Sequence, residues 1–401
     1  MVNKACKDGA RSVSKMKKTE IGVIPEDWEV INLEKNFTLK ARIGWQGLTT
    51  AEYLESGDYC LITGTDFKNG YIDWDNCVYV AKERFDQDRN IQIKENDVLI
   101  TKDGTIGKIA FIDKISNPTT LNSGVFVARP KNATINNRFF YYVLMSFYFD
   151  DFLSKITAGS TITHLYQKDF VQFNFILPPL AEQEAIASAL SDADAWIDSI
   201  EQLIAKKRLI KQGAMQTLLT PQENWEVKKL GEVCNIIKGQ QFNSEYLTDE
   251  GDFPCYSGGI NPSGYSEKFN EKKNTIIISE GGNSCGYVNF IKTNFWLGGH
   301  CYKIVFKTKD LEQHFTYQLL KFNQDKIMAL RVGSGLPNIQ KKSLEDFAIQ
   351  FPSLSEQERI ATILSDMDAE LEALEAQLAK ARQIKQGMMQ ELLTGRIRLE
   401  L

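Results

Sequence analysis

The sequence contains few of the residues from which catalytic and metal centres are built. Only three histidines occur in 401 residues, and none has the spacing of an HxxE or HExxH motif. The sequence contains no GxxxxGK[ST] loop, which excludes a P-loop motor, and no GxGxxG segment opens a helix after a strand. It also lacks an Asp-Pro-Pro-Tyr-like tetrapeptide, so a DNA methyltransferase with its own S-adenosylmethionine site is not expected. We therefore expect no catalytic residue, metal or cofactor in this chain.

Long apolar runs and paired cysteines are also missing. No run of 18 apolar residues exists, and residues 1–18 are basic and polar, without the apolar centre of a signal peptide. An odd number of cysteines without a CxxC pair argues against both a disulfide framework and a zinc site. These features predict a cytoplasmic protein with reduced thiols at Cys6, Cys60, Cys77, Cys234, Cys255, Cys285 and Cys301.

The composition is that of an ordinary protein with packed cores, at 43% hydrophobic and 25% charged residues. A length of 401 residues predicts two or more domains. The net charge of −5 weighs slightly against nucleic-acid binding, since such proteins are commonly basic. A bound duplex meets only one face, however, so the overall charge does not exclude it.

One segment of the chain occurs twice. Residues 178–220 return at 352–394 without a gap, and about 25 of 43 positions are identical. Each copy begins with a proline and the acidic triplet Glu-Gln-Glu, which suits a helix N-terminus. We expect one long helix in 178–220 and a second in 352–401.

Apolar residues recur in both segments at alternating steps of three and four, which predicts a heptad seam. Acidic residues fill the N-terminal half of each copy and basic residues the C-terminal half, so only antiparallel pairing sets opposite charges together. The alternative is one surface helix per domain. We predict an antiparallel two-helix coiled coil along the seams Ile186, Leu190, Ala193, Ile197, Ile200, Ile204 and Ile360, Leu364, Met367, Leu371, Leu374, Leu378, Ala381.

The repeat extends into the two segments outside the helices, 24–177 and 221–351. Each starts near a tryptophan, contains a β-hairpin (97–111 and 275–290), and has a Gly-Ser element just before its long helix. Short β-branched runs between Gly and Asn turns predict mainly β domains with a helix at 136–156 and at 311–330. The fold class is therefore α+β, with two mainly β globular domains joined by two long helices, and 1–23 as a flexible tail.

The two globular segments share this frame but differ in sequence and length between the matched landmarks. This pattern predicts two similar scaffolds with two different binding surfaces. Drift after duplication is the alternative, although it explains poorly why the helices stayed so alike.

The chain resembles specificity (S) subunits of bacterial and archaeal type I restriction–modification systems. The resemblance rests on Pro-x-Leu-x-Glu-Gln-Glu-x-Ile-Ala-x-x-Leu at 178–190 and 352–364, on Ile-Pro-x-x-Trp at 24–28, and on the Gly-Ser element. It implies that each globular part is a target-recognition domain for one half of a bipartite double-stranded DNA target. It also implies that the helices act as a spacer and dock two methyltransferase subunits. The resemblance further implies that motor/nuclease subunits join the full complex and that S-adenosylmethionine binds to the methyltransferase partner.

Base recognition needs polar side chains at loop tips that can enter a groove, whereas Lys and Arg more often contact phosphate. For any single candidate, an ordinary solvated loop residue is the alternative. An enzyme acting alone and a coiled-coil adaptor that binds only proteins remain as the other functions. The candidate DNA-binding residues are Lys40, Arg42, Lys102, Thr105, Lys108, Thr161, Thr163 and His164 in the first domain, and Lys238, Gln240, Gln241, Ser257, Asn261, Tyr265, Asn283, His300 and Asn338 in the second.

Overall fold

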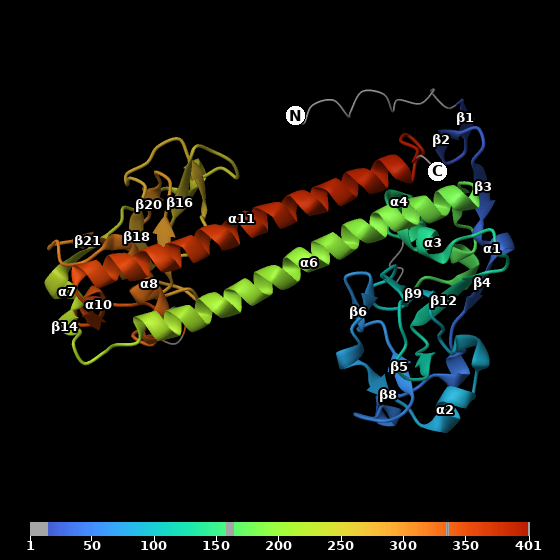
Figure 1. The fold of residues 1–401 in the computed structure, drawn as a ribbon, viewed down its shortest axis with the longest axis horizontal. Coiled ribbons are helices and arrows are strands. Elements are labelled where there is room, and N and C mark those ends of the chain that lie inside the picture. The colour runs from blue at the N-terminus through green and yellow to red at the C-terminus, as the bar shows by residue number, and fades with distance from the viewer. Residues whose placement is uncertain (1–14, 158–163, 334, 336, 400–401) are drawn as a thin grey trace. The chain divides into compact units, whose positions relative to one another are not determined.

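The computed structural model describes residues 15–157, 164–333, 335 and 337–399. The chain divides into two compact units, residues 1–199 with 379–401 and residues 200–378. Each unit contains one globular domain, half of the long helix α6 (Leu180–Leu219) and part of the long helix α11 (Leu354–Leu392) (Figure 1).

The first domain is built on a sheet with the strand order β10-β9-β12-β4. A smaller sheet, β11-β5-β8, and the pairs β6-β7, β13-β3 and β1-β2 complete it. The elements are β1 (Met16–Thr19), β2 (Gly22–Pro25), β3 (Glu29–Asn32), α1 (Leu33–Asn36), β4 (Phe37–Lys40), β5 (Cys60–Ile62), β6 (Phe67–Lys68), β7 (Tyr71–Ile72), β8 (Val78–Tyr79), α2 (Lys82–Asp86), β9 (Val98–Thr101), β10 (Ile109–Phe111), β11 (Thr119–Leu121), β12 (Val125–Pro130), α3 (Asn137–Leu144), α4 (Phe147–Thr157), α5 (Gln167–Phe170) and β13 (Asn174–Leu177).

The second domain repeats the main sheet, the smaller sheet and the β13-β3 pair of the first, and its described residues form no counterpart of β6-β7 or β1-β2. Its main sheet has the order β15-β21-β18-β19, its smaller sheet the order β17-β16-β20, and β14 pairs with β22. In both small sheets the central strand pairs with one parallel and one antiparallel neighbour. The elements are β14 (Glu226–Lys229), α7 (Leu230–Val233), β15 (Cys234–Lys238), β16 (Phe253–Tyr256), β17 (Gly264–Ser266), β18 (Thr275–Ser279), β19 (Val288–Ile291), β20 (Trp296–Leu297), β21 (Cys301–Phe306), α8 (Gln313–Phe322), α9 (Gln324–Met328), α10 (Lys341–Glu345) and β22 (Ala348–Phe351).

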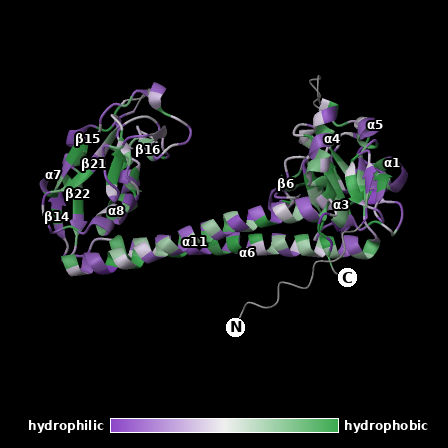
Figure 2. Cartoon of the chain, turned by 90° about the horizontal axis from the view of Figure 1, so that it is seen from above, coloured by the Kyte–Doolittle hydropathy of each residue, from purple (hydrophilic) through white to green (hydrophobic). Residues whose placement is uncertain are grey.

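Each domain has its own hydrophobic core, and the first turns of a long helix are part of it. Ile186 and Leu190 of α6 pack among the buried aromatic side chains of the first domain, and Ile360 and Leu364 of α11 pack in the second. Figure 2 shows strands that are largely hydrophobic in both domains, with hydrophilic residues between them. The first residues of each predicted heptad seam are therefore part of a domain core, to which the last turns of the other long helix also contribute.

The long helices are antiparallel, as predicted. In the first unit Lys385 of α11 forms an ion pair with Asp194 of α6, and in the second unit Lys211 of α6 forms one with Asp368 of α11. Because the repeat offset is 174 residues, these are the same pair formed twice. The domain supports each aspartate: Tyr142 donates to Asp194 at 2.8 Å, and Gln318 donates to Asp368 at 2.6 Å.

The glutamine of the repeated Glu-Gln-Glu motif joins each domain to its helix. The Gln183 amide accepts a hydrogen bond from Asn136 N–H at 2.8 Å and donates to two backbone carbonyls at 2.8 and 3.0 Å. Gln357 makes the equivalent three bonds, and both side chains are fully buried. A buried amide with its partners satisfied holds the helix start in a single position.

The C-terminal segment returns to the start of the first domain, as antiparallel helices require. The Arg398 guanidinium bonds Asp27 at 2.8 and 2.9 Å and Glu182 at 2.6 and 2.9 Å. Glu182, the first residue of the Glu-Gln-Glu motif, is 1% exposed and also accepts the Trp28 indole N–H at 3.0 Å. The guanidinium holds the pKa of Asp27 below its usual value.

Three predicted details are corrected. Residues 16–25 form the β1-β2 hairpin, so the segment 16–23 is not a flexible tail. The helix predicted at 136–156 is two helices, because the Ser146 hydroxyl bonds the Val143 carbonyl and interrupts the run between α3 and α4. The helix predicted at 311–330 is likewise divided, at Asn323, which caps both α8 and α9.

Candidate nucleic-acid interface

The β9-β10 and β18-β19 hairpin loops form the centre of a polar surface in each domain. Gly107 and Gly286 end the two loops with φ of +80° and +89°. A Cβ at Gly107 would lie 2.3 Å from Leu153, and one at Gly286 would lie 2.8 Å from Met328, so each loop sits tightly on a helix. Leu165 N–H bonds the Lys102 carbonyl at 2.7 Å, and Ile339 N–H bonds the Glu280 carbonyl at 2.9 Å, which makes Lys102 and Glu280 equivalent.

In the first domain this surface gathers basic and aromatic side chains. His164 Nδ1 lies 2.5 Å from the Asp103 carboxylate, and the ring is 53% exposed. Lys102 lies over the Phe126 ring at 5.5 Å. Together with residues 41–44 and 165–167, they line a cavity of about 260 Å³. The exposed Tyr166 beside His164 adds an aromatic face.

The remaining predicted residues of the first domain lie as follows. Thr105 and Lys108 are exposed on the hairpin loop, and Lys40 is exposed at the end of β4, directly before the cavity-lining segment. Lys108 also lines a neighbouring cavity with Gly107 and Met145. Thr161 and Thr163 lie outside the described residues.

Arg42 is wrong as a DNA-binding candidate. Its side chain is 1% exposed, and its guanidinium donates to the Leu121 carbonyl at 2.9 Å and to Thr120 at 3.2 Å. Further bonds to the Gln87 side chain and the Arg84 carbonyl leave the group surrounded by acceptors. Burial lowers the pKa of this guanidinium. Arg42 therefore joins the loops of its own domain, and although the residue is part of the cavity wall, its bonded guanidinium is not available to a base or phosphate.

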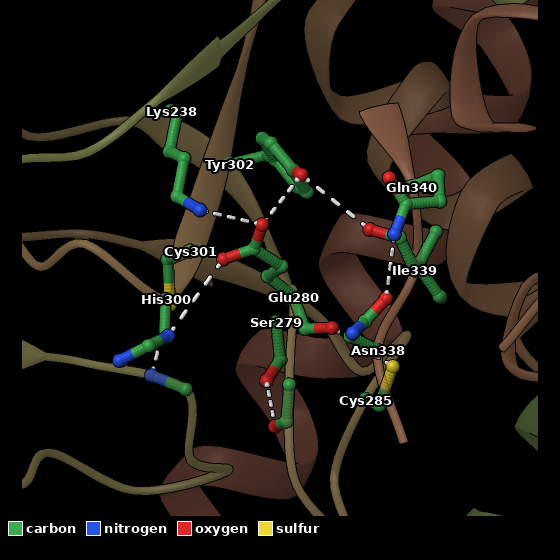
Figure 3. Close-up of polar contacts among 12 residues, drawn as sticks. Lys238, Ser279, Glu280, Cys285, His300, Cys301, Tyr302, Asn338, Ile339 and Gln340 are labelled. Atoms are coloured by element: carbon green, nitrogen blue, oxygen red, sulfur yellow. Dashed lines mark hydrogen bonds and ion pairs between the residues drawn. The ribbon is translucent and has the colours of Figure 1, made fainter. Parts of the chain in front are cut away.

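In the second domain a carboxylate occupies the equivalent position. Glu280 Oε1 accepts hydrogen bonds from Lys238 Nζ at 2.6 Å and from the Tyr302 hydroxyl at 2.7 Å (Figure 3). Glu280 Oε2 lies 3.7 Å from His300 Nδ1. Lys238 and His300 are 51% and 60% exposed, whereas Glu280 is only 14% exposed. The four residues Lys238, Glu280, His300 and Tyr302 are called the Glu280 cluster below.

Further predicted residues of the second domain surround this cluster. Asn338 pairs with Gly281, and its amide oxygen accepts a bond from the Gln340 side chain at 2.9 Å (Figure 3). Asn283 is exposed on the hairpin loop, and its neighbour Ser284 bonds the Gly258 carbonyl at 2.8 Å, which ties in the segment of Ser257 and Asn261. Gln240 and Gln241 are exposed after β15. Tyr265 instead lies in β17 opposite Pro254, half-buried, and no contact joins it to the Glu280 cluster among the described residues.

Comparison with known proteins identifies the family to which the repeated domains belong. The family model described as "Type I restriction modification DNA specificity domain" matches residues 25–207 and again 222–382. The chain belongs to this family. It is 25% identical, over 94% of each chain, to the type I restriction enzyme MjaVIII specificity subunit of Methanocaldococcus jannaschii. It is 28% identical to the putative type I restriction enzyme MjaX specificity subunit of the same organism, over 96% of this chain and 97% of that protein.

A solved structure of the specificity family has the same fold. The crystal structure of a type I restriction–modification system S subunit from M. genitalium matches with a TM-score of 0.67, at 20% identity, over 91% of this chain and 96% of that one. The two matches of the family model coincide with the two copies of the domain-plus-helix repeat, so each copy is one domain of this family.

Sequence analysis missed several residues of the specificity domains' polar surfaces. Asp103, Glu280, Tyr302 and Gln340 were not among the candidates, although they orient residues that were. A signal was present in the repeat itself: aligning the two hairpins places Glu280 opposite Lys102, an inversion of charge at a matched position.

In the described ranges, no three His, Cys, Asp or Glu side chains come together in a way that could hold a metal ion. None of the helices found there is both long and apolar enough to cross a membrane.

Proposed function

We propose that this chain is the specificity subunit of a type I restriction–modification complex, in which each globular domain recognises one half of a bipartite double-stranded DNA target. The observation that carries the proposal is the contrast between matched surfaces. The same hairpin frame presents Lys102 and His164 in the first domain but Glu280 and Asn338 in the second. Two surfaces with different polar side chains on one scaffold suit two different base sequences.

The long helices set the distance between the half-sites. Each helix of about 40 residues is roughly 60 Å long, and each crosses from one unit to the other in sequence. The doubled Asp–Lys pair fixes one register between the helices. A fixed register and a fixed length give a fixed spacing, which is how symmetric DNA-binding proteins meet half-sites about one helical turn apart.

Exposed apolar residues on the helices support the docking of two methyltransferase subunits. Ile210 of α6 and Ile384 of α11 occupy matched positions in the repeat and are 46% and 42% exposed. Leu180 and Leu354, also matched, are 40% and 42% exposed at the two helix starts. An apolar side chain exposed at the same place in both copies suits two copies of one partner.

The chemistry in this proposal belongs to the partners. The chain recognises DNA in the cytoplasm and is not itself an enzyme, the methyltransferase subunits bind S-adenosylmethionine, and motor/nuclease subunits join the full complex. The sequence supports this division because it contains none of the cofactor or P-loop motifs that such activities use.

The test is transfer of labelled methyl groups from S-adenosylmethionine to DNA by the purified chain, by its methyltransferase partner, and by the two together. We expect sequence-specific adenine methylation only from the mixture. Methylation or cleavage by the isolated chain would make it an enzyme. Absence of any sequence-dependent DNA binding by the mixture would leave a protein-binding adaptor.

A further inference from the structure

Three residues of the Glu280 cluster differ from the residues at the equivalent positions of the first domain. Strand register makes Phe126 the counterpart of Tyr302, because Phe126 pairs with Ile100 and Tyr302 pairs with Ile278. The same register along β4 and β15 makes Ala41 the counterpart of Lys238. The first domain therefore has Lys102, Phe126 and Ala41 at the positions that Glu280, Tyr302 and Lys238 occupy in the second.

These three differences are chemically linked. The Phe126 ring needs no hydrogen bond, whereas the hydroxyl of Tyr302, whose side chain is buried, needs an acceptor, and Glu280 supplies it at 2.7 Å. Lys238 then balances the carboxylate charge at 2.6 Å. Since the frame accepts a lysine at position 102, the fold does not require a glutamate at the matched position 280.

The geometry of the Glu280 cluster leaves the Lys238 ammonium group exposed at the protein surface. The carboxylate is nearly buried, so it cannot itself reach far into a groove, but the Lys238 ammonium that it holds is 51% exposed. His300, 60% exposed, lies on the opposite carboxylate oxygen, and the Asn338 amide lies on the same loop surface (Figure 3). An ammonium group fixed by a buried carboxylate loses less rotamer freedom on binding than a free lysine does.

We propose that Glu280 is a positioning residue for base recognition: it holds Lys238 toward the major-groove edge of a guanine in the half-site recognised by the second domain. Guanine offers two acceptors there, O6 and N7, and lysine is a donor that fits them. This proposal rests on the proposed function. It goes further by naming the residue that sets one base preference and the base that is preferred.

The experiment compares E280Q with the wild type in the complex with the methyltransferase, by sequencing methylated sites and by methylation rates on single-base variants of the target. The amide of E280Q still accepts the Tyr302 bond but no longer carries the charge that fixes Lys238. We expect preference for guanine at one position of one half-site to fall by roughly 5- to 150-fold, the worth of a good base contact, with the other half-site unchanged. K238A should relax the same position.

The matched control is E271Q. Glu271 pairs with Lys303 of β21 at 2.5 Å with both side chains 20% exposed, a similar ion pair in the same domain outside the Glu280 cluster. E271Q should keep the wild-type motif. The triple variant K238A/E280K/Y302F, which copies the first domain's set, should fold and lose the same guanine preference.

Three outcomes would overturn the proposal. E280Q with an unchanged motif and rate would show that the carboxylate positions nothing. An equal loss on all sequences, with a weaker salt dependence for K238A, would show that Lys238 contacts phosphate. A relaxed motif in E271Q would show a general loss of packing. If the wild-type complex methylates no specific sequence, the proposed function fails instead, before any variant is compared.

Discussion

Replacing Arg398 with methionine tests how the C-terminal segment closes on the first domain. The change keeps an apolar stem and removes four hydrogen bonds to Asp27 and Glu182. Glu182 is 1% exposed and would retain only the Trp28 indole among these partners. Breaking a buried ion pair costs about 3–5 kcal/mol. Because the Arg398 side chain is 30% exposed, we expect the lower end, about 3 kcal/mol.

The assay is calorimetric unfolding of R398M beside R359M. For a unit of this size, about 3 kcal/mol lowers the unfolding temperature by roughly 6 to 12 °C. Arg359 pairs with Glu356, the repeat counterpart of Glu182, but that pair is exposed (54% and 38%), so R359M should cost less than about 1 kcal/mol. Equal shifts for the two variants would refute the reasoning that burial makes the Arg398 pair matter.

The stabilisation that the contact between Arg398 and Asp27 provides also depends on pH. Arg398 lowers the pKa of Asp27 below its ordinary value of 3.8, so the ionised carboxylate stabilises the folded protein above that pH. As the pH falls through the lowered folded pKa, this contribution disappears. The difference in unfolding temperature between the wild type and R398M should therefore narrow below about pH 3.8. A difference that is constant down to pH 2 would contradict this.

Three further outcomes follow from the helices. Gln357→Ala removes the partner of three backbone groups, of which the Pro352 carbonyl is the buried one. Leaving that carbonyl unsatisfied costs about 1–3 kcal/mol, so unfolding of the second unit should begin roughly 2 to 12 °C earlier while the first is unchanged. Adding one heptad after Ile200 and one after Leu374 lengthens the helices by roughly 10 Å, which should widen the gap between half-sites by one to three base pairs at about 3.4 Å each; an active variant with the original gap would contradict the spacer role. The substitutions Ile210→Asp and Ile384→Asp should each weaken the binding of one methyltransferase subunit by roughly 30-fold or more. A native mass spectrum in which either variant still binds both subunits would contradict this expectation.

The two long helices and their pairing were predictable because the segment that forms them occurs twice in the sequence. Comparison of 178–220 with 352–394 predicted the helices now observed at Leu180–Leu219 and Leu354–Leu392. Their charge gradients predicted antiparallel pairing, which the doubled pair of Lys211 with Asp368 and Lys385 with Asp194 confirms. Both signals lie within a single segment and its copy, so no knowledge of tertiary packing was needed.

The polar surfaces were predicted less well because tertiary contacts decide them. Arg42 has the composition and position of a DNA contact, but side chains and carbonyls 42 to 79 residues away enclose it. Gln183 was taken as part of an acidic first turn, although its bonds run to residues 134 and 136. The role of Glu280 depends on a strand register that places it beside Tyr302 and Lys238, and no local pattern encodes that register.

The central claim is that each domain recognises its own half of the target. The most direct measurement exchanges residues 221–351 for the equivalent segment of another specificity subunit and sequences the methylated sites in a host that carries the matching methyltransferase. The account predicts that one half of the motif changes while the other half and the spacing stay as they were. A motif in which both halves change together would contradict it, because the two domains would then recognise the site jointly.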